Sequence, residues 1–248
     1  MNTELVIDLR PRTPWEAADL GIVLFRQWGL HLYSLWLLVS LPLLLISLWL
    51  VGPLWAPLIL WWFKPLLERP LLYYLSRAVF NDRPTIIEAL KAVPGLFKSQ
   101  WFSWLTWRRF SLSRSFLQPV GQLERMSGKA RRDRIRVLHH DSVPAWLTLI
   151  FLHFETALIF SCYGLIIMLM PEGSWQLGSQ LVSGEFEWLQ ALLVFLVMGA
   201  MAPCYVSCGF CVYLNRRIWL EGWDIEQGFR RLLNRHSVSS AALLLVAV

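Results

Sequence analysis

The chain has 248 residues, of which 56% are hydrophobic and only 16% are charged, and its mean hydropathy is +0.48. Soluble domains carry about 25% charged residues, so this composition excludes an ordinary soluble protein. Several apolar runs approach the length that crosses a bilayer, and together they indicate a polytopic membrane protein. The net charge of +6 is concentrated in blocks, which argues against a nucleic-acid-binding surface and for basic loops on one side of a membrane.

The distribution of Lys and Arg predicts the orientation of the chain. Residues 64–136 hold fifteen of the 23 cations, whereas residues 30–63 and 137–215 hold none. Because basic loops stay in the cytoplasm, we expect a cytoplasmic N-terminus. The two connections without cations, near residues 51–55 and 171–187, are expected outside.

Residues 1–29 are predicted to form a cytoplasmic amphipathic segment. The stretch Thr13-Pro14-Trp15-Glu16 has the residue types of a capping box with proline at the first helical position. Residues 30–80 follow as transmembrane hairpin 1, with Gly52-Pro53 as its outer turn.

The second half of this hairpin leaves two alternatives open. Its apolar beginning rises only about 17 Å at 1.5 Å per residue. The run then carries Lys64, Glu68 and Arg69, together with Pro65 and Pro70. The helix either continues with buried charges or breaks near Pro65. We expect it to continue, because the chain must return to the cytoplasm.

Residues 81–143 are expected to be a basic cytoplasmic linker with interfacial helices. Thr85 and Glu88 have capping-box spacing, and tryptophans at three-residue spacing from Trp101 resemble an interfacial aromatic belt. Clustered arginines form the candidate surface for a partner or lipid, here and after the last span: Arg131, Arg132, Arg134, Arg136, Arg230 and Arg231.

Residues 144–214 are predicted to form transmembrane hairpin 2. Residues 215–238 then form a cytoplasmic amphipathic helix, and residues 239–248 begin a probable fifth span. The expected fold class is an all-α integral membrane protein with four full transmembrane helices plus a partial fifth. Cytoplasmic interfacial amphipathic helices accompany these spans. Each hairpin is followed by an Asn-x-Arg turn, at 81–83 and 215–217, and then by a capped helix, a pattern typical of an internal repeat.

Glu155 lies near the middle of the predicted third span. An ionisable group at that depth is costly and usually faces a partner or a wet cavity. We therefore predict an intramembrane charge network of Lys64, Glu68, Arg69 and Glu155, in which Glu155 pairs with Lys64 or Arg69. Such a pair either fixes the bundle or forms a substrate or proton site.

Cys204, Cys208 and Cys211 have the spacing of an iron–sulfur loop, but that loop must be irregular for its thiolates to converge. Here the three cysteines fall on one stripe of an apolar helix, where small residues favour close helix packing. The sequence contains no nucleophile elbow, phosphate-binding glycine loop or zinc-protease motif. It therefore predicts no catalytic residue, no metal and no cofactor, and argues against an enzyme.

The stretches "PRTPWEAADLG", "WWFKPLLERPLLYYLSRAVF" and "LNRRIWLEGWDIEQGFRRL" resemble uncharacterised bacterial multi-pass inner-membrane proteins encoded beside MoxR-type AAA+ ATPases. The two-span repeat also looks like the membrane domain of glycerophosphodiester phosphodiesterases, whose catalytic domain has no counterpart in this sequence. The first resemblance implies the bacterial inner membrane as location. It also implies the lipid bilayer, other membrane subunits and a cytoplasmic AAA+ ATPase as partners.

Two functions remain open at this point. The first is a non-enzymatic inner-membrane scaffold or assembly subunit that docks partners on its basic cytoplasmic face. The alternative is a small transporter or lipid-handling protein that uses the buried charges of spans 2 and 3. The two functions differ in the effect of Glu155→Gln, which a scaffold tolerates if the variant still folds, whereas a transporter loses flux.

Overall fold

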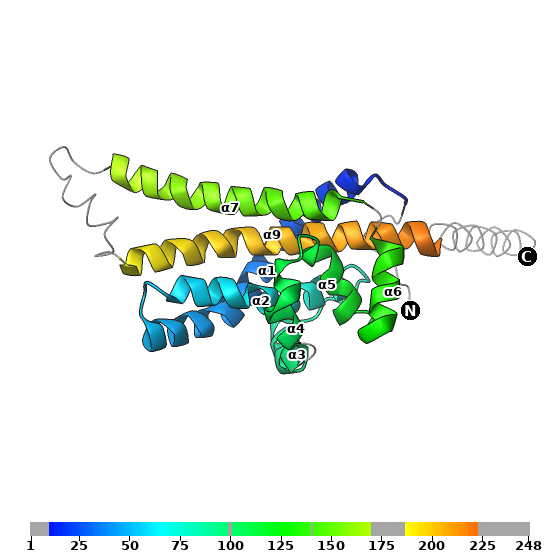
Figure 1. Ribbon diagram of the computed structural model, residues 1–248, viewed down its shortest axis with the longest axis horizontal. Helices are drawn as coiled ribbons and strands as arrows, with labels where there is room; N and C mark the ends of the chain where they lie inside the picture. Colours follow the sequence, from blue (N-terminus) through cyan, green and yellow to red (C-terminus); the bar gives the residue numbers. More distant parts are fainter. Residues whose placement is uncertain (1–9, 99–100, 140, 170–186, 223–248) are drawn as a thin grey trace, which may run out of the picture.

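The computed structural model of the chain describes residues 10–98, 101–139, 141–169 and 187–222 (Figure 1), and all regular elements in these residues are helices. This confirms the all-α class. The elements are α1 (Pro14–Val51), α2 (Ala56–Ala78), α3 (Ile86–Lys98), α4 (Trp101–Leu105), the 3-10 helix η1 (Trp107–Phe110), α5 (Arg114–Gln122), α6 (Gly128–Leu138), α7 (Val143–Met168) and α9 (Glu187–Glu221).

In the described residues, three helices are long and apolar enough to cross a membrane: α1, α7 and α9. The 35 residues of α9 rise about 52 Å, which exceeds a hydrocarbon core of about 30 Å. The predicted second span, α2, has 23 residues and enough length, but it carries four charged side chains. It is therefore not among the three, although the sequence predicts four full spans.

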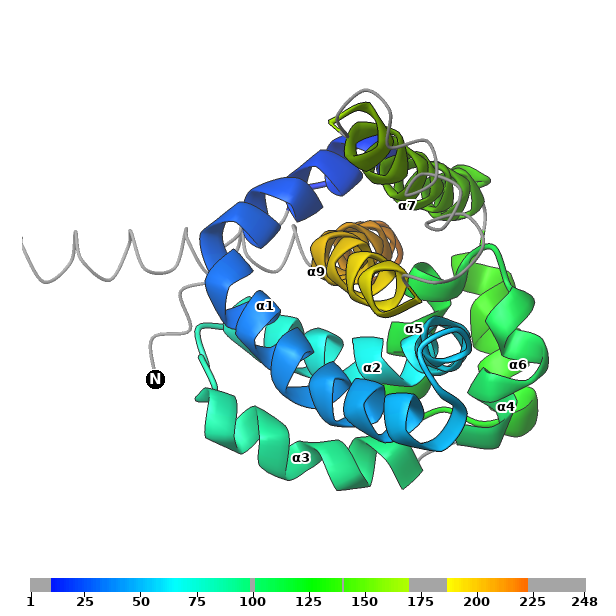
Figure 2. The same ribbon diagram turned by 90° about the vertical axis from the view of Figure 1, so that its left-hand side faces the viewer.

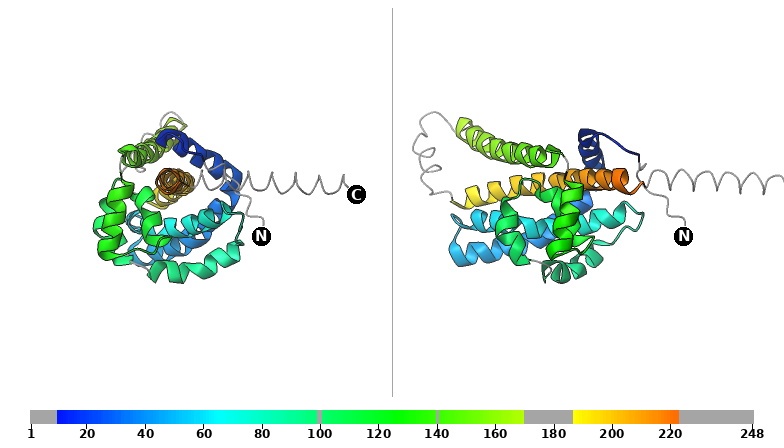
Figure 3. Two further views of the ribbon diagram at one scale, coloured as in Figure 1. Left: turned by 90° about the vertical axis from the view of Figure 1, so that its right-hand side faces the viewer. Right: turned by 45° about the vertical axis from the view of Figure 1, so that its right-hand side comes forward.

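Helix α9 is the centre of the bundle. Figure 2 shows it end-on, with α1, α2, α5 and α7 arranged around it, and Figure 3 shows the same arrangement from two other directions. The α1–α2 connection lies at the same end of the bundle as the start of α9 (Figure 1), and we call this the hairpin end. The opposite end, where Arg12 meets Asn215 and Trp219, is called the basic end.

Helix α1 begins as the sequence predicts. Thr13 N–H donates to Glu16 Oε2 at 2.9 Å and Glu16 N–H donates to Thr13 Oγ1 at 3.4 Å, so the capping box is formed. The helix then runs without interruption to Val51, since Gly29 alone does not end a helix. The described part of the predicted N-terminal segment is therefore continuous with the helix of the first predicted span.

The two predicted Asn-x-Arg turns have different structures. Asn81 lies in a turn with a left-handed backbone, φ +62°. Asn215 lies inside α9, which continues to Glu221, so the prediction of a turn at 215–217 is wrong. The internal repeat therefore fails at this point. The remainder of the predicted helix, residues 223–238, and the predicted fifth span, 239–248, lie outside the described residues.

Helix α2 continues through its two internal prolines, Pro65 and Pro70, which confirms the expected continuation past Pro65. A proline in a helix lacks the N–H that would bond one turn back. Side chains from the linker donate to three other carbonyls of α2. Arg109 donates to the carbonyl of Trp62, Gln118 to that of Pro65 at 3.0 Å, and Gln122 to that of Arg69 at 2.8 Å.

These contacts show that the linker is part of the core. Phe116 and Val120 of α5 are almost fully buried, and α5 lies against α2, α7 and α9. Helix α3 runs across the bundle, so it is seen lengthwise in Figure 2 and nearly end-on in Figure 1. Its Ala89 is buried. Residues 81–143, expected as a cytoplasmic linker, therefore include a structural layer against the long helices.

Helices α1 and α9 come into backbone contact at Gly21. A Cβ atom at this position would lie 2.4 Å from Cys208 Cα and 2.8 Å from the Ser207 carbonyl oxygen. Only a residue without a side chain allows this approach, as in other small-residue crossings of membrane helices. The cysteine stripe therefore has the packing role expected from the sequence at Cys208, which is buried.

We predict that Gly21→Ala lowers the free energy of unfolding by about 1–3 kcal/mol, because the new methyl group meets backbone that cannot move aside. The measurement is thermal or denaturant unfolding of the purified protein in detergent. Gly29→Ala is the matched control on the same helix. Its Cβ atom would make only ordinary contacts, at 3.8 and 3.9 Å, so its stability should be equal or higher. Equal stability of both variants would contradict the close crossing.

Candidate functional site

The buried side of α7 carries a carboxylate. Of its described side chains, only Pro144, Leu147 and Glu155 are buried, and the helix otherwise exposes apolar residues. Lys64 Nζ of α2 lies 2.5 Å from Glu155 Oε2, and the two side chains are 8% and 10% exposed. The sequence left Lys64 or Arg69 as the partner of Glu155, and in the structure the partner is Lys64.

A second ion pair lies one turn further along α2. Arg114 Nη2 donates to Glu68 Oε1 at 3.0 Å, and Glu68 is completely buried. The Arg114 guanidinium also lies over the ring of Tyr205, 5.4 Å from its centroid. The Tyr205 hydroxyl accepts from the Ser115 N–H at 3.3 Å and shares a hydrogen bond of 2.9 Å with Thr148 Oγ1. Tyr205 thus joins α9 to α5 and α7.

The two pairs form one neutral cluster between α2, α5, α7 and α9. Each carboxylate faces a cation, so no net charge is buried at this point. Buried ion pairs add little stability compared with apolar residues, but removal of one partner costs about 3–5 kcal/mol because it leaves a charge without compensation. The cluster therefore fixes which helix faces meet, and its geometry is that of a structural connection.

Arg69 lies apart from this cluster. Its Nη1 donates to the Leu96 carbonyl near the end of α3, where the last carbonyls of a helix have no helical partner. Its guanidinium lies 5.8 Å from the ring of Trp104. Arg108 and Arg131 contact the same ring at 5.6 and 5.7 Å. The four residues predicted as one network are thus divided, with three in the neutral cluster and Arg69 in a group of arginines around a buried tryptophan.

The structure adds two arginines that the sequence did not indicate. Arg114 completes the Glu68 pair, and Arg109 lies over the rings of Trp61 and Trp62, 3.7 and 4.7 Å from their centroids. Both belong to the basic block that was read as cytoplasmic. Arg108 and Arg109 directly follow Trp107, which was a signal for cation–π contacts in this region, but the rings that Arg109 contacts belong to α2. Nothing in the sequence identified Arg114 as the partner of Glu68.

A cluster of acids and arginines holds α6 against α9 at the basic end. Arg134 donates to both oxygens of Glu124, at 2.8 and 3.1 Å, and also contacts Glu221. Arg217 donates to Glu221, and the Tyr213 hydroxyl donates to Glu124 Oε1 at 2.6 Å. Hydrogen bonding to Glu124, with Glu221 contributing, raises the pKa of Arg134 above its usual range. We call these residues the α6 clamp.

The candidate partner surface is smaller than the sequence predicts. Arg131 is 7% exposed, and burial, together with the nearby Arg108, lowers its pKa to about 10. Arg134 belongs to the α6 clamp. Arg132 and Arg136 are exposed, and Arg136 is bridged only to its neighbour Asp133, at 3.7 Å. The remaining two candidates, Arg230 and Arg231, lie outside the described residues.

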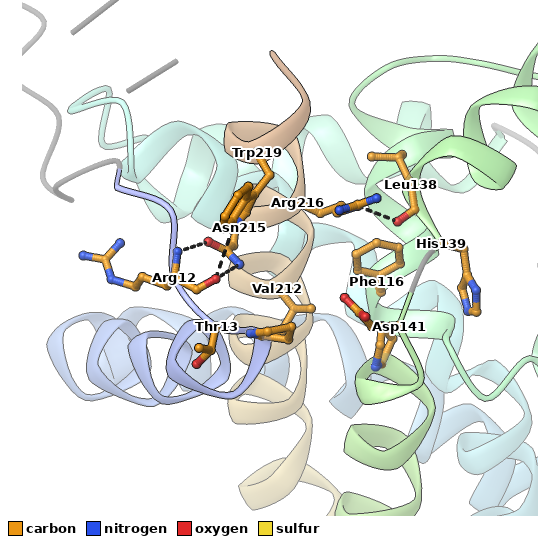
Figure 4. A pocket seen from close by; sticks show the side chains of 12 residues that line it. Arg12, Thr13, Phe116, Leu138, His139, Asp141, Val212, Asn215, Arg216 and Trp219 are labelled. Carbon is orange, nitrogen blue, oxygen red and sulfur yellow. Dashed lines mark hydrogen bonds between the residues drawn. The ribbon is translucent and has the colours of Figure 1, made fainter. Parts of the chain in front are cut away.

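A cavity of about 320 Å³ lies beside the clamp, between the start of α1, the end of α9 and the α6–α7 connection (Figure 4). The Asn215 side chain pairs with the backbone of Arg12 through two hydrogen bonds of 2.9 Å. Arg216 Nε donates to the Leu138 carbonyl at 3.2 Å, where it complements the negative end of α6. Through these contacts, polar groups of the cavity wall connect the start of α1 and the end of α6 to α9.

We predict that the Lys64–Glu155 pair behaves as a coupled unit. Glu155→Gln and Lys64→Met should each lower the free energy of unfolding by about 3–5 kcal/mol, because each leaves one buried charge. The double variant leaves none and should be closer to wild type than the sum of the two changes. Denaturant unfolding of the four proteins in one detergent measures this. Additive effects would show that the two charges do not interact.

No model of a known protein family, no curated protein and no solved structure matches this chain. The ion pairs, the α6 clamp and the exposed arginines are therefore the basis for a functional assignment.

Proposed function

We propose that the protein is a non-enzymatic inner-membrane scaffold or assembly subunit that docks a partner on its basic face. The observation that carries the proposal is the α6 clamp, which fixes one side of α6 to α9 while Arg132 and Arg136 face outward. Cations on a fixed helix keep their spacing, and a partner then binds without the cost of ordering that helix.

The buried charges support the same function. Both carboxylates of the neutral cluster are paired, Glu155 of α7 with Lys64 of α2 and Glu68 of α2 with Arg114 of α5. In this proposal the pairs determine how the helices assemble and carry no substrate. The exposed apolar flank of α7, which includes Leu152, Phe154 and Phe160, faces lipid or the helices of another membrane subunit.

The proposal includes a topology. Helix α2 crosses the membrane as a fourth span, with Lys64 and Glu68 paired to α7 and α5 and Arg69 bonded to α3, since an unpaired charge in hydrocarbon is costly. The basic end then lies in the cytoplasm of a bacterial cell, together with the N-terminus, and the hairpin end lies outside. The partner is an acidic cytoplasmic protein, and the sequence resemblance suggests a MoxR-type AAA+ ATPase.

A small transporter or lipid-handling protein is the second candidate. The observation that favours it is the presence of Lys64, Glu68, Arg114 and Glu155 together inside a membrane bundle, since such groups often line ion and proton pathways. The double variant Lys64→Met with Glu155→Gln separates the two functions. A scaffold with this variant still binds its partner, whereas a transporter that depends on the pair loses flux.

We predict that Arg132→Glu with Arg136→Glu abolishes partner capture without unfolding the protein, because the substitutions replace attraction to an acidic surface by repulsion. Tagged full-length protein is purified in mild detergent, and the proteins recovered with it are quantified by mass spectrometry. The matched control is Lys91→Glu with Lys98→Glu, which makes the same change in charge at two exposed positions of α3.

Wild type and the α3 control should recover the same partner in stoichiometric amount, and the α6 variant should lose it. If wild type carries only lipid, the scaffold proposal fails. Equal loss from both variants would show a general effect of charge and would contradict docking on α6.

A further inference from the structure

A second cavity, of about 580 Å³, opens between α2, α3 and the connection from α5 to α6. Three arginines line it: Arg69, Arg77 and Arg125. The lining contains no acidic side chain. Asp82, which bridges Arg77 at 3.0 Å, does not line the cavity. Three guanidinium groups around one hollow favour an anion.

Two of the three arginines are held in position by contacts within the fold. Arg69 is buried and donates to the Leu96 carbonyl of α3. Arg77 lies over the ring of Tyr73 and donates to its hydroxyl at 2.9 Å. Arg125 is exposed and has a left-handed backbone, φ +52°, which is uncommon for a residue with a long side chain. A set of donors with this charge is suited to a phosphate group.

The other polar groups of the cavity indicate what else the ligand carries. Gln122 lines the cavity and donates its amide to the Arg69 carbonyl. A hydroxyl on the ligand adds no charge, whereas an ammonium group would be repelled by the three arginines. The Tyr73 hydroxyl accepts from Arg77 and keeps its own hydrogen for the ligand.

We infer that this cavity binds the hydroxylated phosphate headgroup of an anionic phospholipid of the phosphatidylglycerol class. The bundle is a membrane protein by its long apolar helices, and α3 crosses the bundle axis (Figure 2). Apolar side chains between the lining segments of α2 and α3 are exposed: Phe80, just after α2, at 42%, and Ile87, in the first turn of α3, at 65%. They provide a surface for acyl chains. This site is separate from Arg132 and Arg136, so it does not depend on partner docking.

The full chain in detergent is tested by native mass spectrometry and by thermal unfolding with added lipid. Phosphatidylglycerol should bind at one molecule per chain and raise the unfolding temperature. Phosphatidylethanolamine has the phosphate but adds an ammonium group, and it should bind at least tenfold more weakly, a difference equivalent to about 1.4 kcal/mol. Inorganic phosphate and glycerol 3-phosphate are the soluble probes. Binding of these without phosphatidylglycerol would overturn the lipid assignment.

Two variants locate the site. Arg125→Asn removes the charge and keeps a residue that tolerates the left-handed backbone, so we expect about tenfold weaker binding of phosphatidylglycerol. Gly95→Leu places a side chain at the cavity wall, where a Cβ atom meets nothing within 4 Å, and should block binding while the fold is retained. The control is Lys129→Asn at an exposed position of α6, which should bind as wild type does.

Unfolding temperatures without lipid confirm that each variant is folded. Weaker binding in all three variants would show general attraction of lipid to a basic surface and would overturn the site. Unchanged binding in Arg125→Asn and Gly95→Leu would do the same.

Discussion

The burial of α2 is the constraint on which the rest of the structure depends. This helix carries Lys64, Glu68 and Arg69 in its buried part and contains two internal prolines, each of which removes a backbone hydrogen bond. Backbone and charged groups away from water must find partners within the protein. The long apolar helices α1 and α9 supply few such partners. The polar groups of α2 therefore require a second set of polar side chains, brought in from elsewhere in the chain.

That second set comes from the basic block between the hairpins. Arg109, Arg114, Gln118 and Gln122 all point to α2, and the short helices that carry them pack as a layer against the long ones. The positive charge of this block therefore has two uses. Part of it compensates α2 inside the bundle, and part of it, at Arg132 and Arg136, remains exposed. The exposed part is held in place by the same layer.

Much of this architecture follows from local sequence. The capping boxes at Thr13 and Thr85 form as predicted, because they depend on residues three positions apart. The Lys64–Glu155 contact could be predicted from the sequence because an acid in an apolar run needs a cation. The Glu68–Arg114 pair could not be predicted, because it depends on how the linker folds back. The sequence does not show which of the fifteen cations in this block lies beside Glu68. The end of α9 was misplaced for a related reason, since Asn215 was read as a turn residue but pairs with the backbone of Arg12.

The central position of α9 has a consequence for biosynthesis. A chain is made from its N-terminus, so α1, α2, α5 and α7 all leave the ribosome before the helix around which they are arranged. The surfaces that meet α9, including Gly21 of α1 and Ser115 of α5, stay open until then. The early helices therefore wait in the membrane or at the translocon with their inner faces uncovered. Insertion of α9 is the step that converts them from a set of separate segments into one bundle.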